Sequence, residues 1–213
     1  MLSLCAAGRP WWSTVGLIDP SALFIDLELL CRSKGWKRVI LVGWSMGARL
    51  ALEFASRHPR MVETLILLAI RKNWPQHEIA AIRRELLADP AAFLRSFYRK
   101  CLLGRKEALR HFINQYQERE LLHVDLDILE AGLSLLQEPL PPVIDRLGLS
   151  GFPPAKIWLV HGENDIIAPC PERLLLDGAT QLILKNEGHS LFLMPSVRDF
   201  SFLAQSGPSE PQQ

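Results

Sequence analysis

The sequence predicts an α/β fold in which a mostly parallel sheet carries a block of helices inserted between its strands. Two apolar runs, residues 39–42 and residues 62–70, have the length and the β-branched content of buried strands. Between them, residues 46–58 place apolar side chains at helical spacing, so the three segments form a parallel βαβ unit. Helical patterns then continue to about residue 142 before strand patterns return. This order is expected when helices interrupt a single sheet.

The other elements follow from local features of the chain. An apolar segment with helical spacing over residues 22–32 is followed by Gly35, which can end a helix in the left-handed conformation. The run 39–42 shows no polar alternation, so we expect that strand to be buried on both faces. The remaining expected elements are helices over residues 77–88, 90–103, 106–121 and 126–137, strands over residues 156–160 and 181–184, and a closing helix over residues 190–203.

The expected organisation is a core interrupted by a helical cap. Residues 1–70 and 151–204 supply the two parts of the core, residues 71–150 form the cap, and residues 205–213 are a polar tail expected to be disordered. A cap in this position covers the carboxyl edge of the sheet, where open α/β sheets bind ligands. With 213 residues, 48% hydrophobic content and a net charge of +1, the chain has the composition of a globular protein without a general affinity for nucleic acid.

Cysteine usage and hydropathy exclude several classes of protein. The four cysteines (Cys5, Cys31, Cys101 and Cys170) are scattered, with no C-x-x-C pair and no histidine at ligand spacing, so we expect reduced thiols and no metal. The first seven residues are too short and lack the positive charge of a signal peptide. No apolar run reaches membrane-spanning length. We therefore expect a cytoplasmic protein without a membrane span.

The first candidate for chemistry is Ser45, in the pentapeptide Gly43-Trp44-Ser45-Met46-Gly47 between the first predicted strand and the next helix. A serine in a strained strand-to-helix turn presents its hydroxyl at the carboxyl edge of the sheet, and the flanking glycines allow strand and helix to approach closely. The backbone N–H of Met46, first in the helix, would point at a developing oxyanion. The alternative is a chance G-x-S-x-G match. The strand before it and the helix after it favour Ser45 as a nucleophile.

Two polar residues follow later strands at the same predicted edge. Asp165 comes just after the strand at 156–160 and His189 just after the strand at 181–184. In the order Ser45, Asp165, His189, the histidine would act as general base and the aspartate would orient it. Taken singly, Asp165 could be a surface turn residue, with Glu163 as a competing acid, and His189 an exposed loop residue. Their joint placement favours a catalytic triad, whereas His161 fits a structural role.

Three blocks of sequence resemble the signature motifs of the α/β-hydrolase superfamily. They are G-W-S-M-G at residues 43–47, H-G-E-N-D-I-I-A-P at 161–169 and E-G-H-S-L-F-L-M-P at 187–195, and the resemblance covers residues 22–203. Within this superfamily, L-E-A-G-L-S-L-L-Q-E-P-L at 129–140 and F-L-R-S-F-Y-R-K-C-L-L-G at 93–104 are similar to the cap of the pimeloyl-[acyl-carrier-protein] methyl ester carboxylesterases of biotin synthesis.

The resemblance implies a serine carboxylesterase that uses no cofactor and hydrolyses a methyl ester on a dicarboxylate chain carried by acyl carrier protein. It also implies that the acyl pocket is lined from the cap and beside the nucleophile. The residues so implicated are Phe97, Tyr98, Arg99, Lys100 and Cys101 in the cap, and Met46 in the elbow. Trp44 is a pocket wall or a packing residue, and the sequence does not separate these two roles.

A cluster of basic residues in the predicted cap bears on the partner. Between residues 95 and 110 there are six basic side chains against one acid, Glu107. We call the six the basic patch; they are Arg95, Arg99, Lys100, Arg105, Lys106 and Arg110. Acyl carrier proteins are strongly acidic, so such a patch would steer one to the site. The alternatives are a solvated helix face or contact with membrane headgroups or nucleic acid, but the patch lacks interleaved aromatic side chains that stack bases.

The chain departs from the superfamily pattern ahead of Ser45. The H-G or G-W-G loop that supplies the second oxyanion N–H is not found, and the segment A-G-R-P-W-W at residues 7–12 lies too close to Ser45. We therefore expect N-terminal strands that are short or missing, and no second donor is assigned. Alternatives to the carboxylesterase are a small-molecule esterase or a C–C bond hydrolase of the same fold. A non-enzymatic alternative is an inactive truncated remnant that binds an acidic partner.

Overall fold

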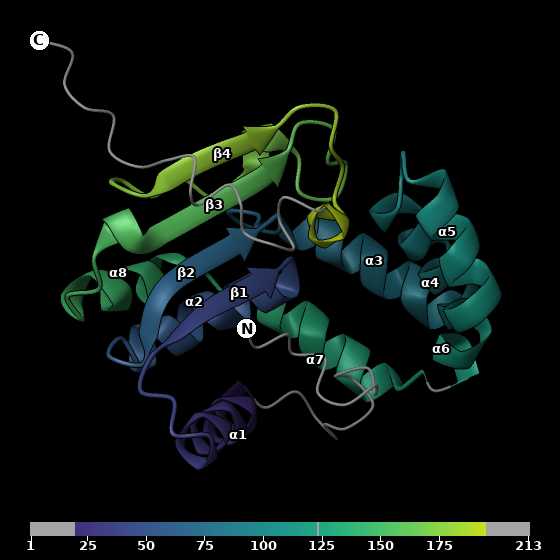
Figure 1. Ribbon diagram of the computed structural model, residues 1–213. Helices are drawn as coiled ribbons and strands as arrows, with labels where there is room; N and C mark the ends of the chain where they lie inside the picture. Colours follow the sequence, from purple (N-terminus) through teal and green to yellow (C-terminus); the bar gives the residue numbers. More distant parts are fainter. Residues whose placement is uncertain (1–19, 123, 195–213) are drawn as a thin grey trace, which may run out of the picture.

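The computed structural model describes residues 20–122 and 124–194, and its centre is a parallel sheet. The sheet has four strands in the order β1-β2-β3-β4, and all three neighbouring pairs are parallel (Figure 1). Their bounds are β1 Val39–Trp44, β2 Val62–Leu68, β3 Ile157–Gly162 and β4 Thr180–Leu184. Each strand therefore ends at the same edge, which brings the segments after β1, β3 and β4 together.

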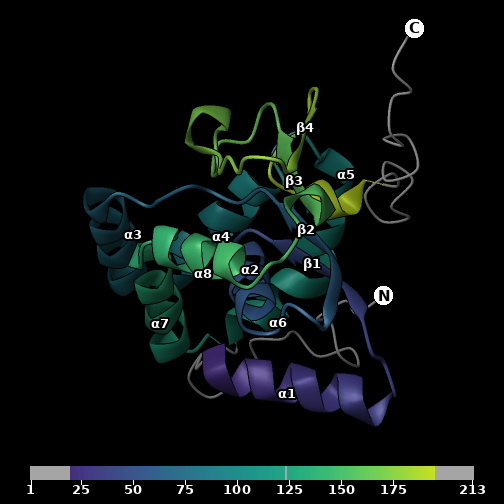
Figure 2. The same cartoon turned by 90° about the vertical axis from the view of Figure 1, so that its left-hand side faces the viewer.

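The main hydrophobic core lies between one face of the sheet and three helices. Helix α1 (Pro20–Ser33) buries Phe24 and Leu27, and α2 (Met46–Arg57) buries a nearly continuous apolar face that includes Phe54. Figure 1 and Figure 2 show α1 at one end of the molecule beneath β1 and α2. Helix α8 (Pro141–Leu149) packs against α2. The opposite face carries a smaller cluster around Ile66 and Val160.

The helical insertion runs from α3 to α8. Helices α4, α5 and α6 are grouped to one side of the sheet in Figure 1. The bounds before α8 are α3 Gln76–Ala88, α4 Pro90–Cys101, α5 Lys106–Phe112, a π-helical turn Ile113–Gln117, α6 Glu118–Leu122 and α7 Leu126–Gln137. Four helices were expected up to residue 137, and the third of these, over 106–121, is divided by the π-helical turn. Helix α8 was not predicted, because helical patterns were expected only to about residue 142. Pro141 and Pro142 occupy the first turn of this helix, where proline is tolerated.

Two predictions about the core need correction. Strand β1 is not buried on both faces: Ile40 is 39% exposed, because within the described residues β1 pairs only with β2 and lies at the edge of the sheet. The predicted closing helix over 190–203 begins as a single 3-10 turn, Leu191–Leu193, and Met194 is already extended. Residues 195–203, the polar tail and residues 1–19, where N-terminal strands were expected to be short or missing, lie outside the described residues.

No helix in the two described ranges is long and apolar enough to cross a membrane. The same residues hold no group of three or more histidine, cysteine or carboxylate side chains arranged to bind a metal ion.

Candidate active site

Ser45 sits in the sharp turn between β1 and α2. Its backbone has φ 54° and ψ −121°, a strained conformation for a residue with a side chain, and its N–H donates to the Leu68 carbonyl at 2.8 Å. A Cβ atom on Gly43 would lie 2.3 Å from the Gly47 carbonyl oxygen, so this close approach of strand and helix requires glycine at position 43. Gly47 is different, because a Cβ atom there would meet nothing within 4 Å. Of the two flanking glycines, only the first is needed for close packing.

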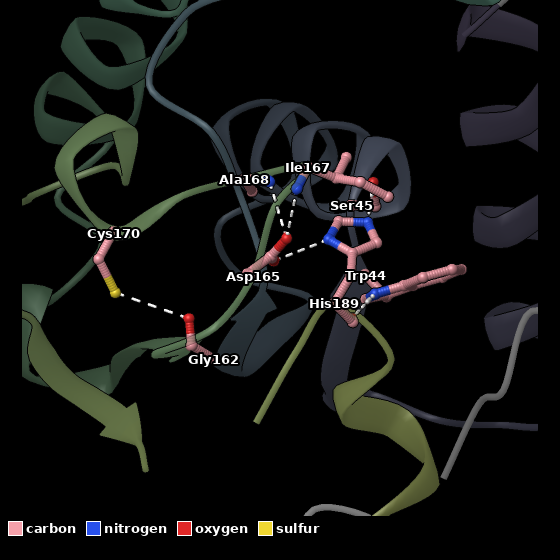
Figure 3. Close-up of polar contacts among 8 residues, drawn as sticks. All are labelled: Trp44, Ser45, Gly162, Asp165, Ile167, Ala168, Cys170 and His189. Atoms are coloured by element: carbon pink, nitrogen blue, oxygen red, sulfur yellow. Dashed lines mark hydrogen bonds and ion pairs between the residues drawn. The ribbon is translucent and has the colours of Figure 1, made fainter. Parts of the chain in front are cut away.

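A chain of hydrogen bonds joins Ser45, His189 and Asp165 (Figure 3). The His189 Nε2 atom lies 3.0 Å from Ser45 Oγ, and His189 Nδ1 lies 2.7 Å from Asp165 Oδ2. An ionised carboxylate can only accept, so Nδ1 carries the proton and Nε2 presents its lone pair to the serine hydroxyl. Both His189 and Asp165 are buried. In this tautomer the imidazole can receive the serine proton.

Asp165 is held in place by the backbone that follows it. Its Oδ1 atom accepts the N–H groups of Ile167 and Ala168, both at 2.8 Å. Burial acts to raise the pKa of Asp165, but the hydrogen bonds and charge of His189 and the two backbone N–H groups outweigh it, so the pKa lies below its ordinary value. The carboxyl group is therefore ionised at neutral pH.

Glu163, the competing acid, does not contact His189 but forms a hydrogen bond elsewhere. Its side chain is exposed on the loop after β3, and its Oε2 atom accepts the N–H of Asn186 at 3.0 Å. It is Asp165, not Glu163, that hydrogen-bonds His189.

The loop that carries His189 packs tightly on its neighbours. A Cβ atom on Gly162 would lie 2.3 Å from the Gly188 carbonyl oxygen, and the Asn164 N–H donates to the Glu187 carbonyl at 2.8 Å. The Trp44 indole N–H donates to the His189 carbonyl at 2.7 Å, and the two rings lie 5.1 Å apart (Figure 3). The structure thus gives Trp44 a contact that supports the histidine, which sequence reasoning missed because no local pattern links residues 145 positions apart.

A small cavity, open to solvent, adjoins Ser45 at the carboxyl edge of the sheet. Its wall is formed by the elbow, the segment after β2 and the α7–α8 region, and includes Met46, Arg49, Trp74 and Leu140. The structure places Met46 in the wall of this cavity. Trp44 and the five α4 residues proposed to bind substrate are absent from its wall.

The α4 residues Phe97 and Tyr98 instead join a row of aromatic rings within the helical insertion, in which Tyr98 packs on Phe112 at 4.8 Å. Arg99 and Lys100 are exposed. Cys101 is buried near the site, and burial, with a smaller contribution from the Asp165 charge, raises the pKa of its thiol to about 12. The thiol is therefore protonated at neutral pH.

The structure divides the basic patch. Arg95 pairs with Glu118 at 3.4 Å, and Arg105 forms an ion pair with Glu187 in the loop that carries His189. The other four members, Arg99, Lys100, Lys106 and Arg110, are exposed, and none of them has a carboxylate partner within the described residues.

His161, at the carboxyl end of β3, is fully buried, and its two ring nitrogens have no hydrogen-bond partner among the described residues. Burial, reinforced by the positive charge of Arg173, lowers its pKa from 6.5 to about 4. The folded protein therefore holds this imidazole neutral, which fits the structural role expected for it.

We expect His161 to make the protein acid-labile. Unfolding lets His161 take up a proton at its ordinary pKa, so its contribution to stability is complete above pH 6.5 and is lost as the pH falls towards 4. The loss should approach about 3 kcal/mol. Urea unfolding of wild type and of His161→Leu at several pH values between 7 and 4 checks this: the variant should show a shallower fall in unfolding free energy. If the unfolding free energy of both proteins falls equally with pH, His161 is not the source of the acid lability.

Comparisons with known proteins agree with this architecture. A family model described as alpha/beta hydrolase fold matches residues 22–126. The pimeloyl-[acyl-carrier protein] methyl ester esterase of Aeromonas hydrophila is 28% identical over 173 residues, which cover 72% of this chain and 64% of the relative. The chain thus spans less than two thirds of the length of this curated relative.

Solved structures share the fold at low sequence identity. A bromoperoxidase from Bacillus anthracis has a TM-score of 0.68 at 14% identity, covering 87% of this chain and 71% of that one. A carboxylesterase structure from Nitrososphaera gargenis has a TM-score of 0.64 at 17% identity, covering 90% and 74% of the two chains. The chain therefore has the α/β-hydrolase fold, and in sequence it resembles the pimeloyl-[acyl-carrier protein] methyl ester esterases.

Proposed function

We propose that this chain is a serine carboxylesterase. The observation that carries the proposal is the hydrogen-bond chain from Ser45 Oγ through the buried His189 imidazole to the buried Asp165, at a strained turn beside an open cavity. A nucleophile, a base in the correct tautomer and an ionised group that orients the base are the parts that acyl transfer needs.

In the proposed reaction Ser45 Oγ bonds to the ester carbonyl carbon while His189 Nε2 takes the serine proton. The imidazolium, stabilised by Asp165, then gives that proton to the alcohol oxygen as the carbon–oxygen bond breaks. Water repeats the sequence on the acyl-enzyme, releasing the acid and restoring Ser45. No step needs a cofactor.

We assign one oxyanion donor, the backbone N–H of Met46. Helix α2 begins at Met46, so this N–H is among the first four of the helix, which have no partner within it. The positive end of the helix dipole adds to its effect on a developing negative charge.

The proposed substrate is a pimeloyl methyl ester carried by acyl carrier protein, in biotin synthesis in the cytoplasm. The support is the name of the Aeromonas hydrophila relative and the four exposed members of the basic patch on α4 and α5. Exposed cations without carboxylate partners are free to attract an acidic carrier protein. In this proposal the helical insertion acts as the cap over the site.

The test compares carrier-bound and small esters in a variant of α5. Lys106 and Arg110 lie four residues apart on this helix, and both are exposed. The double variant Lys106→Glu/Arg110→Glu should lower kcat/KM for the carrier-bound methyl ester by at least ~10-fold at low salt, because steering is electrostatic. Turnover of p-nitrophenyl butyrate should be unchanged.

The matched control is Lys34→Glu/Lys37→Glu, which makes the same charge change before the amino end of β1, away from the site. It should leave both activities unchanged. Equal losses of kcat/KM for the carrier-bound ester in the two double variants would show that net charge, and not the basic patch, governs association with the carrier protein.

A further inference from the structure

We propose that Arg105 is a positioning residue for His189, acting through its ion pair with Glu187; this inference rests on the proposed esterase function. The pair joins the turn between α4 and α5 to the loop after β4, across 82 positions of sequence. In Figure 1 this loop descends on the side of the sheet that faces α4 and α5.

Glu187 is held at both its backbone and its side chain. Its carbonyl accepts the Asn164 N–H at 2.8 Å on the core side, while its carboxylate meets Arg105 on the side of the insertion. The Glu187 side chain is only 19% exposed and that of Arg105 is 32% exposed, so solvent screens this pair less than a surface pair. Glu187 lies two residues before His189, so a displacement of Glu187 would also displace His189.

The two segments also touch through their backbones. A Cβ atom on Gly188 would lie 3.4 Å from the Leu103 carbonyl oxygen. The Arg105 N–H donates to the Leu102 carbonyl at 3.0 Å, and Gly104 has φ +82°. The turn that carries Arg105 is therefore tight. The α4–α5 turn therefore rests against the histidine loop.

At the end of α4, Cys101 and Leu102 are buried, whereas α5 has no buried side chain. The three hydrophobic clusters found within the described residues contain no side chain from α5. Within the described residues, the other ion pairs between core and insertion are Arg71 with Glu78 at the start of α3 and Arg49 with Glu138 just after α7. The Arg105–Glu187 pair is thus placed to keep the α4–α5 turn against the catalytic loop.

Loss of the pair should act on catalysis without acting on the binding of a small ester. Neither Arg105 nor Glu187 lines the cavity beside Ser45, so KM should change little. His189 Nε2 must stay near its 3.0 Å contact with Ser45 Oγ, and a displacement of about 1 Å can cost ~10²-fold in rate. The predicted signature is a fall in kcat alone.

The experiment measures p-nitrophenyl butyrate hydrolysis by wild type, Arg105→Glu, Glu187→Arg and the double swap. Each single variant should lose ~10-fold or more in kcat, and the swap, which restores opposite charges, should recover to within ~3-fold of wild type. The matched control is Arg95→Glu, which breaks the Arg95–Glu118 pair within the insertion with the same change of charge. It should stay within ~2-fold of wild type.

Hydrogen exchange over residues 185–189 supplies a readout independent of turnover. Exchange should accelerate in Arg105→Glu and not in Arg95→Glu. If Arg105→Glu does not fold, Arg105→Gln, which removes the charge alone, takes its place.

The outcomes separate the two proposals. If wild type is active but Arg105→Glu has the same kcat as Arg95→Glu, the inference is overturned while the esterase proposal stands. The same holds if the kcat of the double swap is no higher than that of the single variants. If wild type shows no turnover that depends on Ser45, the esterase proposal is overturned. The hydrogen-exchange rates of residues 185–189 then decide whether the Arg105–Glu187 pair holds the loop in place.

Discussion

Replacing Ser45 with alanine is expected to abolish ester hydrolysis. The substitution removes the Oγ atom that lies 3.0 Å from His189 Nε2 and leaves no nucleophile for the acyl-enzyme step. In serine hydrolases with a triad, the loss in kcat is about 10⁶-fold. Turnover of p-nitrophenyl acetate and butyrate, with the initial burst from acyl-enzyme formation, should disappear. The folded state should persist, because alanine keeps the Cβ atom and the turn.

Ser134→Ala is the matched control for this prediction, because it removes a hydroxyl from the exposed side of α7, where Ser134 contacts Glu130. It should retain wild-type rates. If Ser45→Ala and wild type hydrolyse both esters equally, the chain does not use Ser45. The alternative of an inactive hydrolase fold that binds an acidic partner would then be the better account.

Asp165→Asn is expected to lower kcat by about 10⁴-fold, through the tautomer of His189. The Asp165 Oδ1 atom accepts two backbone N–H groups, from Ile167 and Ala168, so the single oxygen of asparagine will occupy that position. Its NH₂ group then faces His189 Nδ1 and donates to it. The imidazole must place its own proton on Nε2, where it can no longer accept the serine proton.

The measurement is the kcat of p-nitrophenyl butyrate hydrolysis near neutral pH, with Glu163→Gln as the control. Glu163 lies two residues earlier and accepts the Asn186 N–H, and glutamine keeps an oxygen for that bond. The control should remain within a few-fold of wild type. A comparable loss in both variants would place the effect in the loop as a whole and not in the carboxylate of Asp165.

Much of the core could be predicted because its signals are local. The helical and strand periods place α1, α2 and β2 within a few residues of their observed bounds, and strand, turn and helix meet at Ser45 as expected. Parallel strands end at one edge, so residues that directly follow them must lie near one another. That rule predicts that Asp165 and His189 approach Ser45.

Two of the predictions that the structure overturned concern helix α8 and strand β1. Helix α8 was overlooked because helical patterns were expected only to about residue 142. Pro141 and Pro142 are breakers inside a helix but acceptable in its first turn, and sequence alone did not decide which applied. The exposed face of β1 was overlooked because an apolar run does not reveal how many neighbours a strand has. Both depend on the surroundings of a segment and not on its composition.

The sequence by itself therefore determined the order of the four described strands, the elbow and the residues that follow each strand. Only the tertiary structure decided between Asp165 and Glu163, gave Trp44 its contact with His189, and separated Arg105 from the rest of the basic patch. The physical reason is that dihedral preferences and periodicity act over a few residues. Contacts between side chains that are distant in sequence depend instead on how the helices and strands pack together.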